Sequence, residues 1–184
     1  SFIYFFTFIF SIYNIFKFVL FIDNICIKFV YKVIFSFYII IHSTIKNLIE
    51  IENEIKLSLD KLKVNNLPKI IAVSKTFKID KILPLIEYGH QHFGENKVQE
   101  AIDKWSDIKL KNPNIKLHLI DGLQTNKVKF ALKLFDFIHS VDSEQLAKKI
   151  ADEEIKNLKK LKILIQVNIE NKKKKSVVEI DSFE

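Results

Sequence analysis

The stretch KIIAVSKTFKIDKILPLIEYGHQHFGEN, residues 69–96, contains one complete strand–helix–strand pattern. Its first part, KIIAVS (residues 69–74), is rich in apolar residues that favour a strand. Residues 79–88 have helical spacing, and Gly89 is a typical C-terminal stop for a helix. HQHFGEN (residues 90–96) predicts a short strand that runs into a loop. The stretch therefore predicts a βαβ unit with two parallel strands.

The same alternation continues along the chain to residue 169. Further strands are predicted at residues 116–120, 135–141 and 161–169, and further helices at residues 97–110, 125–134 and 143–159. The last strand, LKILIQVNI, is apolar enough to be buried on both faces of a sheet. No glycine-rich loop follows the first strand, which disfavours a nucleotide-binding doubly wound sheet. We therefore predict an α/β fold, a partial (β/α) TIM-type barrel with about five of the eight strands.

A helix and an apolar extension precede this barrel. The helix is predicted from apolar residues at three- and four-residue steps, with Ser43 or Thr44 as its N-cap and residues 65–68 as its end. The apolar positions are Leu48, Ile51, Ile55, Leu59 and Leu62.

Residues 1–42 differ in composition from the rest of the chain. They hold 11 of the 17 phenylalanines and contain no alanine, glycine, proline, glutamate or glutamine. Residues of this kind are encoded by codons of adenine and thymine alone, so we expect an artefactual extension translated from AT-rich non-coding DNA. A membrane anchor is the alternative, although charged residues interrupt the run of about 20 apolar residues that a span needs. A soluble role is a third possibility. We expect the folded domain in residues 43–184.

The charge and cysteine content exclude several classes of function. All 29 basic side chains are lysines, and the net charge of +7 is diffuse except at residues 172–175. A nucleic-acid surface would add arginines and stacking aromatics, so we expect no nucleic-acid partner. Cys26 is the only cysteine, which excludes an intrachain disulfide and argues against a cysteine-based zinc site. We expect no metal and a cytoplasmic location, and the oligomeric state stays open.

Lys75 closes the first predicted strand. A lysine at such a position ordinarily reaches into water while its aliphatic stem lies on apolar neighbours. In a (β/α) barrel, however, functional groups lie at the carboxyl ends of the strands. Both interpretations of Lys75 are open on the pattern alone.

Five short motifs carry a resemblance to a known family. They are AVSKT (residues 72–76), HFGENKVQE (92–100), HLIDGLQTNK (118–127), HSVDS (139–143) and ILIQVNI (163–169). In this order and spacing, they resemble the pyridoxal phosphate homeostasis proteins over residues 44–176. The resemblance implies a barrel like the N-terminal domain of alanine racemase.

The resemblance also implies that the chain binds pyridoxal 5′-phosphate (PLP) as an internal aldimine on Lys75. We expect partial burial of this amine at the barrel mouth, since desolvation favours its neutral, nucleophilic form. Asn96 and His118 lie in motifs that line the cofactor side in this family. For His118, a hydrogen-bonded histidine inside a strand is an equally good interpretation.

Other positions in these motifs have two interpretations each. Glu95 faces the barrel interior or caps the next helix. Asn168 lies at the functional rim or forms a turn. Residues 124–126 are predicted to cap a helix, with at most a secondary functional role.

The sequence departs from the family pattern in two places. Asp121 stands where the family usually has glycine, and Val177 replaces the glycine of a Lys-Ser-Gly element. We expect the reading frame to be lost just after Ser176, which would leave the barrel without its glycine-rich phosphate loops. Such a barrel is expected to be unstable, to aggregate or to need partners.

The predicted function is that of a PLP carrier in PLP homeostasis, without an enzymatic turnover of its own. Racemisation would need a second acid or base on the opposite face of the cofactor. The alternatives are a racemase-like PLP enzyme, a membrane-anchored interaction protein and a non-functional truncated fragment.

Overall fold

The computed structural model describes residues 42–64, 66–168 and 178–179. Apart from His42, the apolar extension lies outside these residues, and so does the lysine run at 172–175. The backbone contacts divide the chain into two units, residues 1–57 and 58–184. The predicted N-terminal helix is confirmed as α3 (Ser43–Leu62), and Lys63 follows it in the left-handed conformation. Among the described residues, no helix combines the length and hydrophobicity that crossing a bilayer requires.

The second unit contains a five-stranded parallel sheet in the order β1-β2-β3-β4-β5. The strands are β1 (Ala72–Val73), β2 (His92–Glu95), β3 (Lys116–Leu119), β4 (Phe137–Val141) and β5 (Lys162–Ile165). The helices between them are α4 (Ile79–Tyr88), α5 (Val98–Lys111), the 3₁₀ helix η1 (Thr125–Lys127) with α6 (Val128–Leu134), and α7 (Glu144–Asn157). Each strand pairs with its sequence neighbour, as in a (β/α) barrel. The α/β prediction is therefore confirmed.

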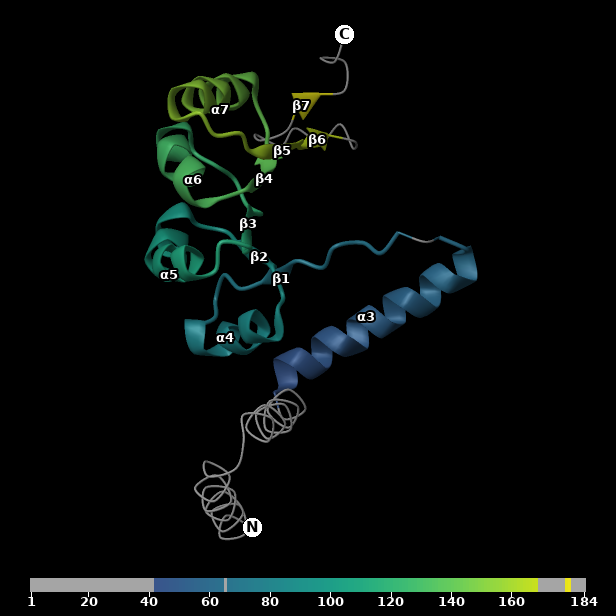
Figure 1. Cartoon of the computed structure of the whole chain (residues 1–184). Coiled ribbons are helices and arrows are strands. Elements are labelled where there is room, and N and C mark those ends of the chain that lie inside the picture. Colours follow the sequence, from purple (N-terminus) through teal and green to yellow (C-terminus); the bar gives the residue numbers. More distant parts are fainter. Residues whose placement is uncertain (1–41, 65, 169–177, 180–184) are drawn as a thin grey trace, which may run out of the picture. The chain divides into compact units, whose positions relative to one another are not determined.

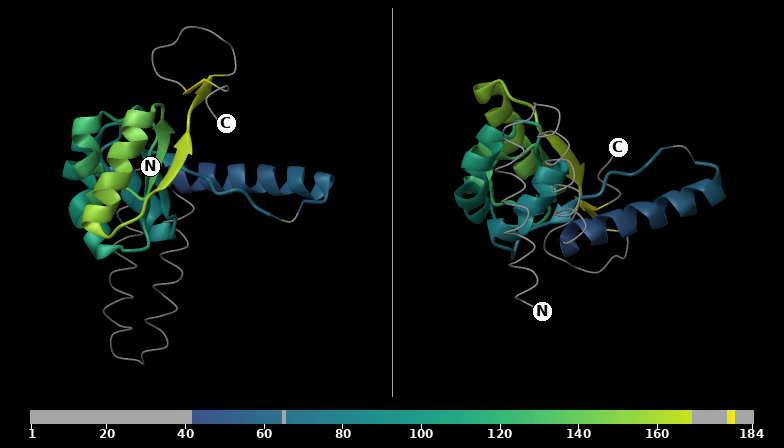
Figure 2. Two further views of the ribbon diagram at one scale, coloured as in Figure 1. Left: turned by 90° about the horizontal axis from the view of Figure 1, so that it is seen from above. Right: turned by 60° about the horizontal axis from the view of Figure 1, so that its bottom comes forward.

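Helices α4 to α7 stack along one side of this sheet (Figures 1 and 2). The core lies between the two layers and consists mainly of aliphatic side chains. Phe93 of β2 and Trp105 of α5, both fully buried, lie with ring centroids 4.9 Å apart. None of the helices α4 to α7 lies on the opposite face of the sheet, which corresponds to the inner face of a barrel.

The helix boundaries follow from local signals in the sequence. Helix α4 occupies the predicted residues 79–88, and Gly89 ends it with a φ of 100°. This left-handed conformation is accessible to glycine at little cost, and the Gly89 N–H donates to the carbonyl of Ile86.

The prediction of a fifth strand buried on both faces is wrong. Ile163 and Leu164 point to opposite faces of the sheet, yet they are 43% and 47% exposed. The reason is that β5 is an edge strand whose sole neighbour among the described strands of this sheet is β4. The predicted strand is also split, because residues 167–168 form β6 (Val167–Asn168), which pairs in parallel with β7 (Val178–Glu179).

Asp136 joins the start of β4 to β3 and α5. Its carboxylate accepts a hydrogen bond from the Leu117 N–H at 2.9 Å and forms an ion pair with Lys109. Asp136→Ala leaves that N–H without its acceptor, so we expect the free energy of unfolding to fall by about 1–3 kcal/mol. Asp107→Ala, which removes an exposed carboxylate of α5, should change it by less than about 0.5 kcal/mol. Urea denaturation of both variants checks this, and equal losses would contradict it.

Candidate functional site

Lys75 lies where the sequence placed it, directly after β1 at the carboxyl end of the strand. It occupies the turn that the Phe77 N–H closes by donating to the Ser74 carbonyl at 3.1 Å. Val73, the last residue of β1, lies on the inner face of the sheet near Gly94, and Lys75 follows it by two residues. No hydrogen bond or ion pair with another described residue engages the Lys75 amine.

The expected partial burial of Lys75 is not found, because its side chain is exposed. The physical reason is the position of β1 at the edge of the sheet. Its described neighbour is β2 on one side, and no described strand lies on the other. The amine is therefore accessible to a ligand, but the described residues do not enclose it.

Asn96 follows β2 at the same end of the sheet at which Lys75 follows β1. The register pairs Val73 with Gly94, and the Ser74 N–H extends the ladder by donating to the Gly94 carbonyl. Two residues further on, Lys75 and Asn96 follow the ends of adjacent strands, whose backbones are about 4.8 Å apart. Asn96 is half-buried. These two predicted site residues thus follow neighbouring strands, and their shared role in one site stays a prediction.

Gly94 makes room for an apolar floor beside these two residues. A Cβ atom at this position would lie 3.2 Å from Ile71 Cγ2, 3.4 Å from Ile120 Cγ2 and 3.5 Å from Val73 Cγ2. The three aliphatic side chains therefore converge over the glycine on the inner face, and a larger residue would force them apart. These three side chains form an apolar floor on the inner face of the sheet.

His118, the third predicted site residue, lies one level deeper in the sheet. It pairs in register with Gly94 on one side and with Phe137 on the other. Its Nε2 lies 2.9 Å from Nδ1 of His92, and its Nδ1 lies 2.9 Å from Nε2 of His139. Its ring also stacks on Phe137 with centroids 4.2 Å apart. Because both ring nitrogens are engaged, the geometry favours the interpretation of His118 as a hydrogen-bonded strand histidine.

The three imidazoles form a row across β2, β3 and β4, which we call the histidine row (His92, His118 and His139). Burial first, and then the neighbouring His139 and His92, lower the pKa of His118 from 6.5 to about 4. Burial also lowers the pKa of His92 and of His139. The row is therefore neutral at pH 7. In the part of the chain that the structure describes, no group of three or more histidine, cysteine or acidic side chains could hold a metal ion.

Glu95 fits neither of its two predicted roles. It is fully buried on the helix side of the sheet, where Oε1 accepts hydrogen bonds from Ser74 Oγ, Lys104 Nζ and Trp105 Nε1. The sequence carried a signal for this placement, because Glu95 follows Phe93 by two residues and so shares its face. Asn168 falls in β6, so neither of its two interpretations is decided.

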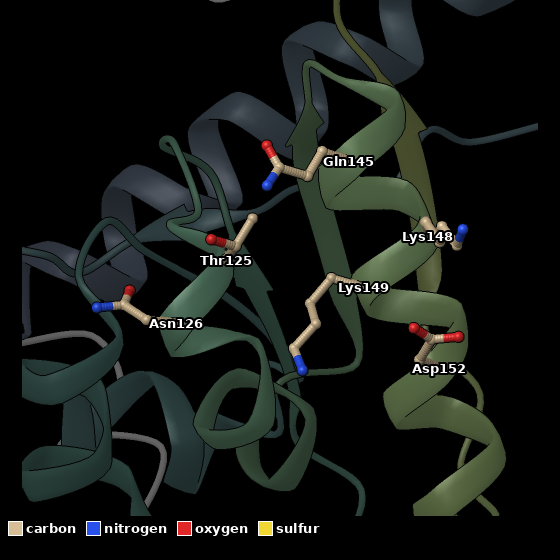
Figure 3. A pocket seen from close by; sticks show the side chains of 6 residues that line it. All are labelled: Thr125, Asn126, Gln145, Lys148, Lys149 and Asp152. Carbon is tan, nitrogen blue, oxygen red and sulfur yellow. The ribbon is translucent and has the colours of Figure 1, made fainter.

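Residues 124–126 lie on the helix side of the sheet. Gln124 precedes η1 without a side-chain hydrogen bond to the helix end, so its predicted capping role is not found. Thr125 and Asn126 instead line a pocket of about 390 Å³ between η1 and α7 (Figure 3). The rest of its lining consists of Gln145, Lys148, Lys149 and Asp152.

The fold and this site define a class of protein: a parallel (β/α) sheet of barrel type with a lysine, unpaired among the described residues, at the carboxyl end of its first strand. Residues 48–173 match the family described as "Alanine racemase, N-terminal domain". The chain belongs to this family.

Curated relatives and solved structures agree with this assignment. The chain is 36% identical over 113 residues to the "Pyridoxal phosphate homeostasis protein" of Vibrio cholerae, covering 60% of this chain and 48% of the relative. The protein of the same name from Buchnera aphidicola is 40% identical over 126 residues, with coverages of 66% and 55%. The chain thus spans about half the length of these relatives. The resemblance predicted from the five motifs is confirmed.

Two solved structures show the same architecture. PipY of Synechococcus elongatus, solved with PLP bound, is 37% identical and superposes with a TM-score of 0.52 over 62% of this chain and 55% of PipY. An unknown protein from Bifidobacterium adolescentis is 27% identical, with a TM-score of 0.62 over 70% of this chain and 56% of that protein.

Proposed function

We propose that this chain binds PLP through Lys75 and serves in PLP homeostasis as a carrier. The observation that carries the proposal is the unpaired, accessible amine at the carboxyl end of β1 in a family with a PLP-bound relative. The chemistry that PLP supplies is an aldehyde, which condenses reversibly with a neutral amine and releases water. A single suitably placed lysine is enough to store the cofactor in this way.

The residues around Lys75 fit part of PLP. The amine meets the aldehyde end, and the floor of Ile71, Val73 and Ile120 suits one face of an aromatic ring. Asn96, which follows the neighbouring strand β2, would add an amide that can donate or accept hydrogen bonds. A glycine-rich phosphate cradle is not found among the described residues, so the fit covers the aldehyde and the ring.

Lys75→Arg tests the proposal, with Lys78→Arg as its matched control. Both variants keep the positive charge, and both positions are exposed, three residues apart. Arginine cannot condense with an aldehyde in this way, so we expect PLP retained after gel filtration to fall by roughly tenfold or more in Lys75→Arg. Lys78→Arg should retain as much PLP as the unmodified chain. Equal retention by the two variants would rule out Lys75 as the site.

A racemase-like enzyme is the second candidate, because the matched family takes its name from alanine racemase. We favour the carrier, since both ring nitrogens of His118 are engaged by other imidazoles and are not free to act as an acid or base. Incubation with alanine and PLP in deuterated water separates the two functions. The carrier exchanges no substrate α-proton above the rate with free PLP, whereas a racemase does. A cytoplasmic location, suggested by the single cysteine, belongs to the same proposal.

A further inference from the structure

A buried polar network surrounds Ser74, the residue before Lys75, between the sheet and α5. Glu95 Oε1 is 2.7 Å from Ser74 Oγ, 2.9 Å from Lys104 Nζ and 2.9 Å from Trp105 Nε1. Glu95 is fully buried, and the Lys104 side chain is 15% exposed. The network therefore ties the end of β1 to β2 and to the middle of α5.

The network holds the peptide group that leads into Lys75. The Ser74 carbonyl, which belongs to the Ser74–Lys75 peptide bond, accepts a hydrogen bond from Lys104 Nζ at 2.8 Å. The same carbonyl accepts the Phe77 N–H that closes the turn, and the Ser74 N–H donates to the Gly94 carbonyl. Every polar group of Ser74 is thus fixed, while the exposed amine one residue later stays free.

Stability alone gives a weak reason for this arrangement. Replacing a buried ion pair by apolar side chains of similar volume is often neutral or stabilising, because burying two charges costs much of what their attraction returns. Moreover, Glu95 Oε2 is buried without a hydrogen-bond partner in the described part of the chain. The network instead fixes orientation. Three donors meet at Glu95 Oε1, and one of them, Lys104 Nζ, also donates to the Ser74 carbonyl that closes the turn.

We propose that Glu95 is a positioning residue for Lys75, acting through Ser74 and Lys104 to hold the turn of residues 74–77. The inference rests on the proposed function. An amine on an exposed turn reacts selectively only if its backbone keeps one conformation, because orientation contributes to the rate of condensation. Without the Glu95 charge, Lys104 loses its ion pair and is no longer held against the Ser74 carbonyl, which closes the turn.

Glu95→Gln is the main test, since it keeps the shape of the side chain and removes the charge opposite Lys104. Glu100→Gln is the matched control, because Glu100, on α5 like Lys104, forms an exposed ion pair with Lys97 just before that helix. Ser74→Ala removes the hydroxyl, with its hydrogen bonds to Glu95 and to the Gly94 carbonyl, and carries the test if Glu95→Gln fails to fold. Far-ultraviolet circular dichroism and urea denaturation identify the folded variants.

Two readouts separate positioning from general stability. The first needs no PLP: in Glu95→Gln, hydrogen exchange at the Phe77 amide should accelerate roughly tenfold relative to core amides such as Leu132. The second is the ratio of label on Lys75 to label on Lys78 after PLP treatment and borohydride reduction, which should fall roughly fivefold. Glu100→Gln should change neither.

Unchanged exchange at Phe77 and an unchanged labelling ratio in folded Glu95→Gln or Ser74→Ala would overturn the positioning role. Failure of the proposed function has a different signature. In that case, the unmodified chain itself shows no preference for Lys75 over Lys78, and the Phe77 exchange alone decides whether Glu95 fixes the turn.

Discussion

Trp105→Ala is expected to lower the free energy of unfolding by about 4 kcal/mol, the range for truncating a buried aromatic side chain. Trp105 is fully buried against Phe93, so its loss leaves a cavity between the sheet and α5. It also removes the Nε1 donor from the buried Glu95 carboxylate. Urea denaturation followed by circular dichroism measures the change.

Trp105→Phe separates these two contributions. It keeps most of the ring volume against Phe93 and removes the hydrogen bond to Glu95, so we expect a loss of about 1–2 kcal/mol. If Trp105→Ala cost no more than Trp105→Phe, the cavity would not be the main term, and the packing of α5 on the sheet would be described wrongly.

Acidification from pH 7 to pH 4 is expected to destabilise the fold through His118. Its pKa is lowered from 6.5 to about 4 in the folded chain, mainly by burial and then by His139 and His92. The unfolded chain therefore takes up a proton at a pH where folded His118 does not. The resulting stability is fully present above pH 6.5 and is lost as the pH falls towards 4. The folded and unfolded pKa values differ by about 2.5, which corresponds to a loss of about 3 kcal/mol in the free energy of unfolding.

Other charges near the histidine row modify this effect. Lys69 lowers the pKa of His118 and of His92, whereas Asp136 raises both. His118→Phe removes the titrating group and keeps an aromatic ring against Phe137. Urea midpoints between pH 7 and pH 4 should therefore fall less steeply in His118→Phe than in the unmodified chain. Equal slopes would show that His118 is not the residue responsible.

The sequence predicted the features that depend on local pattern. The bounds of α4 came from apolar spacing followed by Gly89, and the place of Lys75 followed from the end of an apolar run. The exposure of β5 could not be predicted in this way, because the burial of a strand depends on which other elements cover it. Lys75 is exposed for the same reason, since β1 is the other edge strand of the sheet.

The polar clusters could not be predicted without knowing the register of the strands. His92, His118 and His139 are separated by more than 20 residues in sequence, and they meet because parallel pairing sets β2, β3 and β4 side by side. The network of Glu95 likewise joins Ser74 to Lys104 across 30 residues. Alternation predicts which face such a side chain occupies, but the partner on that face comes only with the packing of the helices.

The most direct test of the central claim is a map of where PLP attaches. The chain is incubated with PLP, reduced with borohydride and digested, and the pyridoxyl label is quantified by mass spectrometry for each lysine peptide. We predict that the label is concentrated on Lys75. Label spread evenly over the 29 lysines would contradict the account, because it would mean that the aldehyde meets only ordinary surface amines.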